Sequence, residues 1–241
     1  MPMLSSIAYW SFLLLVATAI LSFSVQKKKL TPAAAIAAAG IGILIFTASG
    51  IKGILMLLSF FGIGVWATAH KKQIKNKHQS AAGESTGRNV GQVFANGGVA
   101  AITGLLMLVN PAHHDLYLLM MAASLASALA DTLSSELGMI YGRSYVNVLT
   151  FKKETNGLDG VISLEGTIIG AFGALVIGIL HGGPIISVLI ITIAGILGNL
   201  CDSIIGATLE RKHWIGNNMV NFLNTLIAAL LGGLFDLYSL S

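Results

Sequence analysis

The chain has few charged residues and almost no cysteine. Asp, Glu, Lys and Arg make up only 10% of its 241 residues, and 55% are hydrophobic, whereas soluble domains carry about a quarter charged residues. It therefore lacks the polar surface that a domain needs in water, and we interpret it as an integral membrane protein. A single cysteine, Cys201, excludes a disulfide framework and a cysteine-based zinc cluster, because both need several cysteines.

Several catalytic motifs are also missing. The sequence has no Gly-x-x-x-x-Gly-Lys-Ser/Thr run, no His-Glu-x-x-His and no Gly-x-Ser-x-Gly, which excludes a P-loop, a zincin site and a hydrolase nucleophile elbow. The net charge of +4 could suggest nucleic acid, but basic residues of a membrane protein first report its topology. We therefore expect no nucleic-acid partner.

Hydropathy predicts an all-α, polytopic transmembrane helical bundle that forms one domain over residues 1–241. A spanning helix needs roughly 20 mainly apolar residues, so the chain can hold at most about nine. The first segment has no basic flank before it and no cleavage site after it, and is therefore expected to be a retained span. Spans two and three are separated only by the neighbourhood of Gly50, which predicts a tight helical hairpin. The eight candidate spans are residues 8–25, 31–49, 51–69, 92–109, 116–135, 164–181, 185–205 and 219–238.

The basic residues predict which side each loop faces. With both termini outside, thirteen of the fourteen Lys and Arg residues fall in cytoplasmic connections, and only Lys52 falls outside. Positively charged loops remain on the cytoplasmic side of membranes, so this topology is favoured over its inverse. The absence of a transit peptide and the short loops favour a prokaryotic plasma membrane.

Polar residues cluster near the predicted cytoplasmic ends of four spans. An ionisable group inside a span costs roughly 2.5 to 3.5 kcal/mol, so such residues need a reason. Asp131 and Ser135 share a face of the fifth span, and Asp202 repeats that pattern in the seventh. Lone Asn or Ser residues in a span are usually hydrogen-bond partners of other helices. A concentration of them at one depth predicts a polar site that faces the cytoplasm. The stripes of the fourth and eighth spans consist of Asn89, Gln92 and Asn96, and of Asn217, Asn221 and Asn224.

The two carboxylates suit a hard cation. Asp131 and Asp202, with Asp159 from the loop between them, offer the oxygen ligands that Mg²⁺ prefers. Arg88, Lys153 and other bases lie on the same side. Acids and bases at one site are typical of phosphoryl transfer, in which metal and cations share the charge of a polyphosphate.

Residues 156–167 read NGLDGVISLEGT, with three glycines just before the sixth span. Glycines at the start of a helix allow backbone N–H groups to turn towards a phosphate. This pattern indicates a phosphate site at the start of the sixth span.

Four motifs resemble a known family. GRNVGQVFANG, ADTLSSELG, GLDGVISLEGT and CDSIIGATLE are similar to those of the DUF92 membrane family, which includes plant phytyl-phosphate kinase and the transmembrane protein 19 group. The resemblance covers a catalytic core of about residues 80–230, preceded by an N-terminal three-helix part in residues 1–70. More distantly, Asp131 with Ser135, and Ser163 with Thr167, resemble the pattern of CTP-dependent polyprenol kinases and phosphatidate cytidylyltransferases. Ala130 stands where that pattern has Gly.

The resemblance implies a kinase that transfers the γ-phosphate of a nucleoside triphosphate, expected to be CTP, to an isoprenyl monophosphate such as phytyl or geranylgeranyl phosphate. Its lipid chain would stay in the bilayer while its phosphate reached the cytoplasmic boundary. Mg²⁺ would bind Asp131, Asp202 and Asp159, and the catalytic set would add Arg88, Lys153 and Arg211. Substrate or nucleotide would bind Asn89, Gln92, Asn96, Ser135, Glu136, Gly157, Asp159, Gly160, Ser163, Gly166, Thr167, Asn217 and Asn221.

Two other activities remain open from the sequence. Attack at the α-phosphate would release pyrophosphate and make a CDP-lipid, as a cytidylyltransferase does. A transporter would also place acids and Asn residues in its spans, but the outer halves of these spans are almost wholly apolar. Oligomeric state and the length of the lipid chain do not follow from the sequence.

Overall fold

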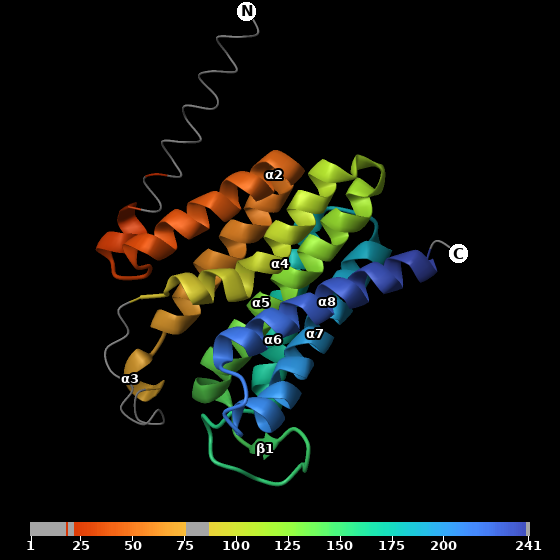
Figure 1. Ribbon diagram of the computed structural model, residues 1–241. Coiled ribbons are helices and arrows are strands. Elements are labelled where there is room, and N and C mark those ends of the chain that lie inside the picture. Colours follow the sequence, from red (N-terminus) through yellow and green to blue (C-terminus); the bar gives the residue numbers. More distant parts are fainter. Residues whose placement is uncertain (1–17, 19–21, 76–86, 240–241) are drawn as a thin grey trace, which may run out of the picture.

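A computed structural model describes residue 18 and residues 22–75 and 87–239 of the chain (Figure 1). Helices dominate these residues, which confirms the all-α prediction, and one small antiparallel hairpin is added. The elements are α2 (Pro32–Ala69), α3 (Lys72–Lys75), α4 (Val90–Val109), the 3₁₀ helix η1 (Pro111–His113), α5 (His114–Tyr141), β1 (Tyr145–Asn147), β2 (Val161–Ser163), α6 (Leu164–His181), α7 (Ile185–Ile205), the π-helical turn η2 (Gly206–Glu210) and α8 (Asn217–Ser239).

Six helices of the described residues are long and apolar enough to cross a membrane: α2, α4, α5, α6, α7 continued by η2, and α8. Helix α2 has 38 residues and is interrupted at Gly50, whose φ of 63° lies in the left-handed region that glycine adopts readily. Most of the predicted first span, residues 8–25, lies outside the described residues. The count of eight spans is therefore approximate, although the chain is a polytopic membrane protein as predicted.

The two arms of α2 run antiparallel, which confirms the predicted hairpin at Gly50. Near the turn, the carbonyl of Ala48 contacts His114 Nε2 at 3.3 Å, where α5 begins. At the end of the second arm, His70 Nε2 contacts the hydroxyl of Tyr141 at 2.8 Å, where α5 ends. The second arm thus runs the length of α5. The first arm lies beside the second and runs in the opposite direction (Figure 1).

The connections alternate between two ends of the bundle. We call the end that carries residues 27–30, 70–72, 87–89, 142–163 and 211–217 the polar end. The other end carries Gly50, η1 and the turn at residues 182–184, and we call it the opposite end. Among the described residues, Lys52 is the one Lys or Arg at the opposite end. The segregation of charge expected from the sequence is therefore present in the fold. Which end faces the cytoplasm stays a prediction.

Helix α5 is the centre of the bundle (Figure 1). Residues 122–130 of this helix are all buried, and most are small, which lets α4, α6, α7, α8 and the second arm of α2 all pack around it. Lipid tails are as apolar as the helices, so close packing of backbones rather than hydrophobic burial holds such a bundle together.

Glycines mark the closest approaches to α5. A methyl group on Gly166 of α6 would lie 2.8 Å from the carbonyl oxygen of Ser134, and one on Gly195 of α7 would lie 2.9 Å from Cβ of Ala126. Both distances are too short for a carbon atom, so only glycine allows these helices to lie where they do.

We expect Gly195→Leu to destabilise the bundle by about 1 to 3 kcal/mol, the usual effect of overpacking a core. Gly62→Leu is the matched control, because a methyl group on Gly62 would meet no atom within 4 Å. Thermal unfolding in detergent, followed by size-exclusion chromatography, measures both variants. Equal midpoints for the two would show that α7 does not need its close approach to α5.

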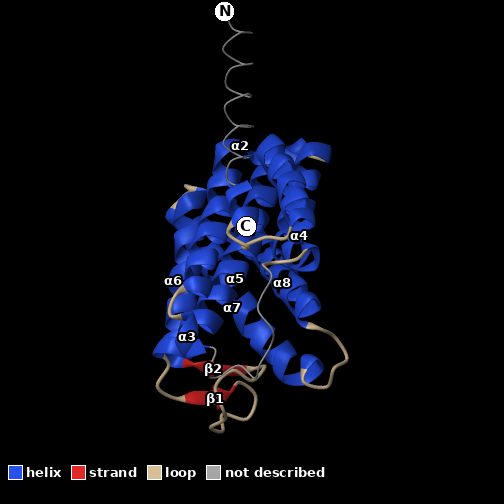
Figure 2. Ribbon diagram, turned by 90° about the vertical axis from the view of Figure 1, so that its left-hand side faces the viewer, coloured by secondary structure: helices blue, strands red, loops and turns tan. Residues whose placement is uncertain are grey.

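The hairpin of β1 and β2 lies below the helices at the polar end (Figure 2). Tyr145 pairs with Ser163 and Asn147 with Val161. These strands fall in the connection between the fifth and sixth predicted spans, where three-residue strands are too short for an alternating hydrophobic pattern to be recognised. The hairpin places the glycine-containing loop at residues 156–160 at the polar end of the bundle.

Candidate functional site at the polar end

A cavity of about 730 Å³ opens at the polar end of the bundle. It is lined by α4, α5, α6, α7 and α8, and at the polar end by residues 27–29, the end of α2 and residues 156–163. Its size is within the usual range for small-molecule sites, but its lining is more polar than usual. The polar stripes predicted on four spans meet at this cavity.

Asp131 of α5 and Asp202 of α7 lie next to each other in the lining of the cavity. Their carboxyl groups are close enough to share a proton. Two carboxylates this close repel each other when both are charged, and a bound cation between them removes that repulsion. The pair is therefore an acidic centre that suits a bound cation.

A chain of hydrogen bonds from α5 through α8 reaches Asp202. Asn224 of α8 donates from Nδ2 to Asp202 Oδ1 at 2.6 Å, and its own Oδ1 accepts from the hydroxyl of Ser127 at 3.1 Å. One turn further along α5, the hydroxyl of Ser134 donates to Asn199 Oδ1 of α7 at 3.1 Å. These bonds join α5, α7 and α8 at one depth, and they fix the orientation of Asp202.

The donor set fits Mg²⁺ better than a softer metal. Among the described residues, no group of three or more His, Cys, Asp or Glu side chains is arranged to hold a metal ion. Asp131 and Asp202 would supply two carboxylates, and Mg²⁺ usually takes one or two carboxylates with waters and substrate phosphates. Asp159, the third predicted ligand, lines the same cavity without joining a three-carboxylate cluster.

Arg88 is positioned by an unusual backbone pairing. Its N–H donates to the carbonyl of Lys29 at 2.9 Å, and its carbonyl accepts from Thr31 N–H at 3.1 Å. Gly87 makes this approach possible, since its φ is +91° and a methyl group there would lie 2.8 Å from Lys28 O. The pairing brings the basic residues 27–29 to the rim of the cavity beside Arg88.

The guanidinium of Arg88 lies over the ring of Phe60, 5.7 Å from its centre. Burial lowers the pKa of Arg88, while the carboxylates of Glu136 and Asp131 act in the opposite direction. Arginine keeps its proton in proteins regardless. The cavity therefore holds a fixed positive charge facing its acidic centre.

Asn89 has a different position from the one predicted. Its side chain accepts from Gln92 N–H at 3.0 Å, and Gln92 Oε1 accepts from Asn89 N–H at 2.9 Å. This reciprocal pair is a capping box that begins α4. Asn89 does not line the cavity, whereas Gln92 and Asn96 do.

Arg211 clamps the loop between the two strands instead of facing the cavity. Its Nη2 donates to Glu154 Oε2 at 2.6 Å and its Nε to the carbonyl of Asp159 at 2.5 Å. Gly160, with φ +72°, packs on η2, where a methyl group would lie 2.6 Å from Ala207 N. The loop is thus held against α7 by a salt bridge and a glycine contact.

The clamp should depend on pH. The hydrogen bond from Arg211, followed by that from Asn147, lowers the pKa of Glu154 below its usual 4.5. A lowered native pKa means that the salt bridge contributes fully above the unfolded pKa and is lost as pH falls through the native one. We expect a nitroxide on a Lys153→Cys variant, in a Cys201→Ala background, to gain mobility only below the usual Glu pKa. With Glu154→Gln added, the label should be mobile at every pH. If Glu154→Gln leaves the mobility of the label unchanged, the salt bridge of Arg211 with Glu154 does not hold the loop.

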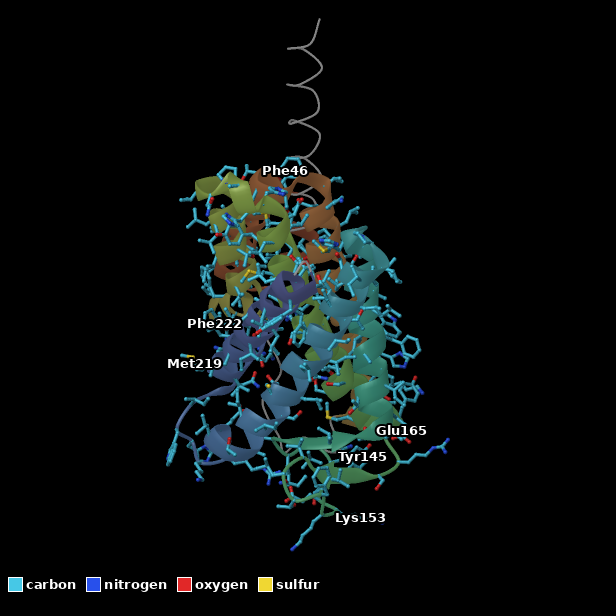
Figure 3. The ribbon with its side chains drawn as sticks, turned by 90° about the vertical axis from the view of Figure 1, so that its right-hand side faces the viewer. Phe46, Tyr145, Lys153, Glu165, Met219 and Phe222 are labelled. Atoms are coloured by element: carbon cyan, nitrogen blue, oxygen red, sulfur yellow. The ribbon has the colours of Figure 1, made fainter. Side chains whose placement is uncertain are left out.

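Most of the predicted site residues line this one cavity. Those that do are Asp131, Asp202, Arg88, Gln92, Asn96, Ser135, Glu136, Gly157, Asp159, Gly160, Ser163, Gly166, Thr167, Asn217 and Asn221. Asn89, Arg211 and Lys153 do not line it, and Lys153 points away from the bundle (Figure 3). The side chain of Ser163 accepts from Gly166 N–H at 3.1 Å and so caps α6, besides lining the cavity. The chemical role of each of these residues stays a prediction.

Other lining residues were not among the predicted set. Glu210 lines the cavity because the π-helical turn carries α7 beyond its predicted end at residue 205. Its signal in the sequence was its place at the end of the CDSIIGATLE motif. Lys28 and Lys29 were interpreted only as topology signals, and Asn156 and Tyr145 had no signal of their own.

Comparison with known proteins agrees with this assignment to a membrane family. Residues 15–229 match the family described as integral membrane protein DUF92, so the match also includes helices that precede the four motifs. An uncharacterized membrane protein of Methanocaldococcus jannaschii is 34% identical over 197 residues, covering 79% of each chain. An uncharacterized membrane protein of Synechocystis is 32% identical over 240 residues, covering 95% of this chain and 90% of the relative.

A plant relative lies within the same set of matches. The chloroplastic protein VTE6 of Arabidopsis thaliana is 31% identical over 212 residues, covering 83% of this chain and 63% of its own length. No solved structure matches the chain. The family match covers most of the sequence, and the described helices have the length and composition of membrane spans. The chain is a member of the DUF92 family of integral membrane proteins.

Proposed function

We propose that the protein is a magnesium-dependent membrane kinase that transfers the γ-phosphate of a nucleoside triphosphate to an isoprenyl monophosphate. We expect the nucleotide to be CTP. The observation that carries this proposal is the adjacent pair Asp131 and Asp202 in a cavity that Arg88 and a lysine-rich rim also line. Family resemblance to phytyl-phosphate kinases supports it, as does the chloroplastic relative VTE6.

The site meets the needs of this reaction. A phosphate monoester has a second pKa near 6, so it is already a nucleophile at neutral pH and needs no strong base. Its oxygen attacks the γ-phosphorus and forms a new P–O bond, the bond from the γ-phosphorus to the β–γ bridging oxygen breaks, and the nucleoside diphosphate leaves with that oxygen. Catalysis then depends on positioning and on neutralising charge.

The residues of the cavity divide these tasks. Asp131 and Asp202 would hold Mg²⁺, which when bound neutralises and orients the phosphate oxygens. Arg88 would face the same oxygens with its fixed positive charge, and Lys28 and Lys29 would attract the anionic substrates at the rim. Gln92, Asn96, Asn217 and Asn221 would orient substrate by hydrogen bonds from α4 and α8.

Orientation follows from the distribution of charge. By the positive-inside rule we expect the polar end to face the cytoplasm, where nucleoside triphosphates are found. We propose a prokaryotic plasma membrane as the location. The lipid phosphate would then meet the water-soluble nucleotide at the boundary where the cavity opens.

The test uses purified protein, Mg²⁺, geranylgeranyl monophosphate and CTP labelled at the γ-phosphate. We expect labelled isoprenyl diphosphate and unlabelled CDP, with no product in EDTA. Labelled pyrophosphate together with a CDP-lipid would make the protein a cytidylyltransferase instead. No turnover with any of several nucleotides and isoprenyl phosphates would overturn the kinase proposal, and uptake into liposomes would then test transport.

A further inference from the structure

A second hollow lies on the outer side of the helices that line the cavity. It has a volume of about 430 Å³ and an almost wholly apolar lining from α4, α8 and Leu44 of α2. Phe94, Ile102 and Met219 border it and are each about half exposed, at 51%, 50% and 49%. The hollow is therefore a groove open to the surroundings of the bundle, which for these helices is lipid.

The groove and the cavity lie on two sides of the same helix pair. On α8, Asn217 and Asn221 line the cavity, whereas Met219 and Phe222 line the groove. On α4, Asn96 lines the cavity, whereas Phe94 lines the groove. Figure 3 shows Met219 and Phe222 on the side of the bundle away from Glu165 of α6.

A close contact of α4 and α8 separates the groove from the cavity. A methyl group on Gly91 would lie 2.6 Å from Asn218 Nδ2. Both residues line the groove, and their neighbours Gln92 and Asn217 line the cavity. The polar end of the groove thus lies one residue from the polar site on each helix.

The groove also has the length of a lipid chain. Its lining follows α4 from Gly91 to Leu105, which at a rise of 1.5 Å per residue is about 21 Å. Half of the hydrocarbon core of a bilayer is about 15 Å thick. The groove therefore extends from the level of the polar cavity past the middle of the membrane, in the direction that a lipid chain takes.

We propose that this groove binds the hydrocarbon chain of the phosphorylated lipid substrate, whose phosphate reaches the cavity at the polar end of the groove, beside Gln92 and Asn217. This inference rests on the proposed function for the identity of the phosphate group. The apolar lining matches a chain of isoprene units, and the adjoining amides and cations match its phosphate. The phosphomonoester of such a substrate carries more negative charge than the phosphodiester of an ordinary bilayer lipid, and therefore gains more from these cations.

Photo-crosslinking tests the groove without requiring turnover. The probe is an isoprenyl monophosphate with a diazirine near the end of its chain, added to the full protein in phosphatidylcholine nanodiscs. We expect the peptide that contains Ile102 and Leu105, at the far end of the groove, to be labelled, and unlabelled geranylgeranyl monophosphate to compete. Labelling that only follows lipid exposure, for instance at Phe172 and Ile193, or that added phosphatidylcholine removes equally well, would overturn the proposal.

Filling the groove tests its role in the reaction. Gly98 lines its floor, and a methyl group there would lie 3.6 Å from the ring of Phe222, an ordinary contact. We expect Gly98→Leu to raise KM for geranylgeranyl monophosphate about tenfold, the effect of losing the burial of about two methylene groups. KM for dimethylallyl monophosphate, whose chain is too short to follow the groove, should not change.

Two controls separate the possible outcomes. Gly62→Leu adds the same side chain to the bundle surface away from the groove and should leave both KM values unchanged. Ala101→Phe fills the groove from another position and should reproduce the effect if Gly98→Leu does not fold. If wild-type protein shows no kinase activity but the crosslinks form, the proposed function fails and the lipid groove stands. Equal KM changes for long and short substrates would overturn the groove.

Discussion

Asp131→Asn and Asp202→Asn are each expected to lower phosphoryl transfer at least about 1,000-fold while the protein stays folded. Each change removes one of the two carboxylates that would hold Mg²⁺, and the loss of several kcal/mol of transition-state stabilisation corresponds to that factor. Steady-state assays with the labelled nucleotide measure the loss. Titration with Mg²⁺ should show that high concentrations do not restore activity.

Folding and catalysis separate in this experiment because the substitution also removes charge repulsion. Repulsion between two carboxylates this close lowers the stability of the folded protein when no metal is bound. An amide at either position should therefore leave the melting temperature unchanged or raise it. Asp115→Asn is the matched control, because this carboxylate is fully exposed at the opposite end. Activity retained in Asp131→Asn or Asp202→Asn would remove that residue from the site.

Arg88→Gln should lower kcat/KM by about 100- to 1,000-fold, the usual effect of losing one group that stabilises developing charge in a transition state. Arg88 faces Asp131 and Glu136 from a partly buried position, where water screens its charge less than at the surface. Arg88→Lys should not restore full activity, because an ammonium lacks the planar fork of donors that a phosphate accepts.

The control for Arg88 is Arg143→Gln. The side chain of Arg143 is 91% exposed, and its Nε lies 3.9 Å from Glu165 Oε1, so its removal should change kcat/KM little. Loss of the contact between Arg88 and the ring of Phe60 is expected to lower the melting temperature slightly. A large fall in melting temperature with little change in kcat/KM would indicate that Arg88 is a structural residue.

The polar stripes show which site residues can be predicted from their spacing along a helix. Asp131 and Asp202 could be predicted to meet at one depth, because spacing along a helix determines which residues share a face. The same reasoning anticipated the contribution of Asn96 and Asn221. In contrast, the neighbouring Asn89 is a capping residue, and only the position at which α4 begins distinguishes the two roles.

Loop residues were harder to assign because no periodicity constrains them. Lys153 and Arg211 lie close in sequence to residues that line the cavity, yet one points away from the bundle and the other holds Glu154. Lys28 and Lys29, far from the core motifs in sequence, reach the rim through the backbone pairing of Lys29 with Arg88. Such pairings join segments that no local pattern connects.

The sequence by itself determined that this chain is a bundle of membrane helices with a hairpin at Gly50 and nearly all its basic residues at one end. Composition, span length and residue spacing are local properties, and the membrane imposes them on any chain that crosses it. Only the tertiary structure decided which polar residues line one cavity, that Arg211 clamps a loop, and that an apolar groove lies behind α4 and α8. These features depend on how glycines such as Gly91 and Gly160 let separate segments approach, and that packing is a property of pairs of segments rather than of either alone.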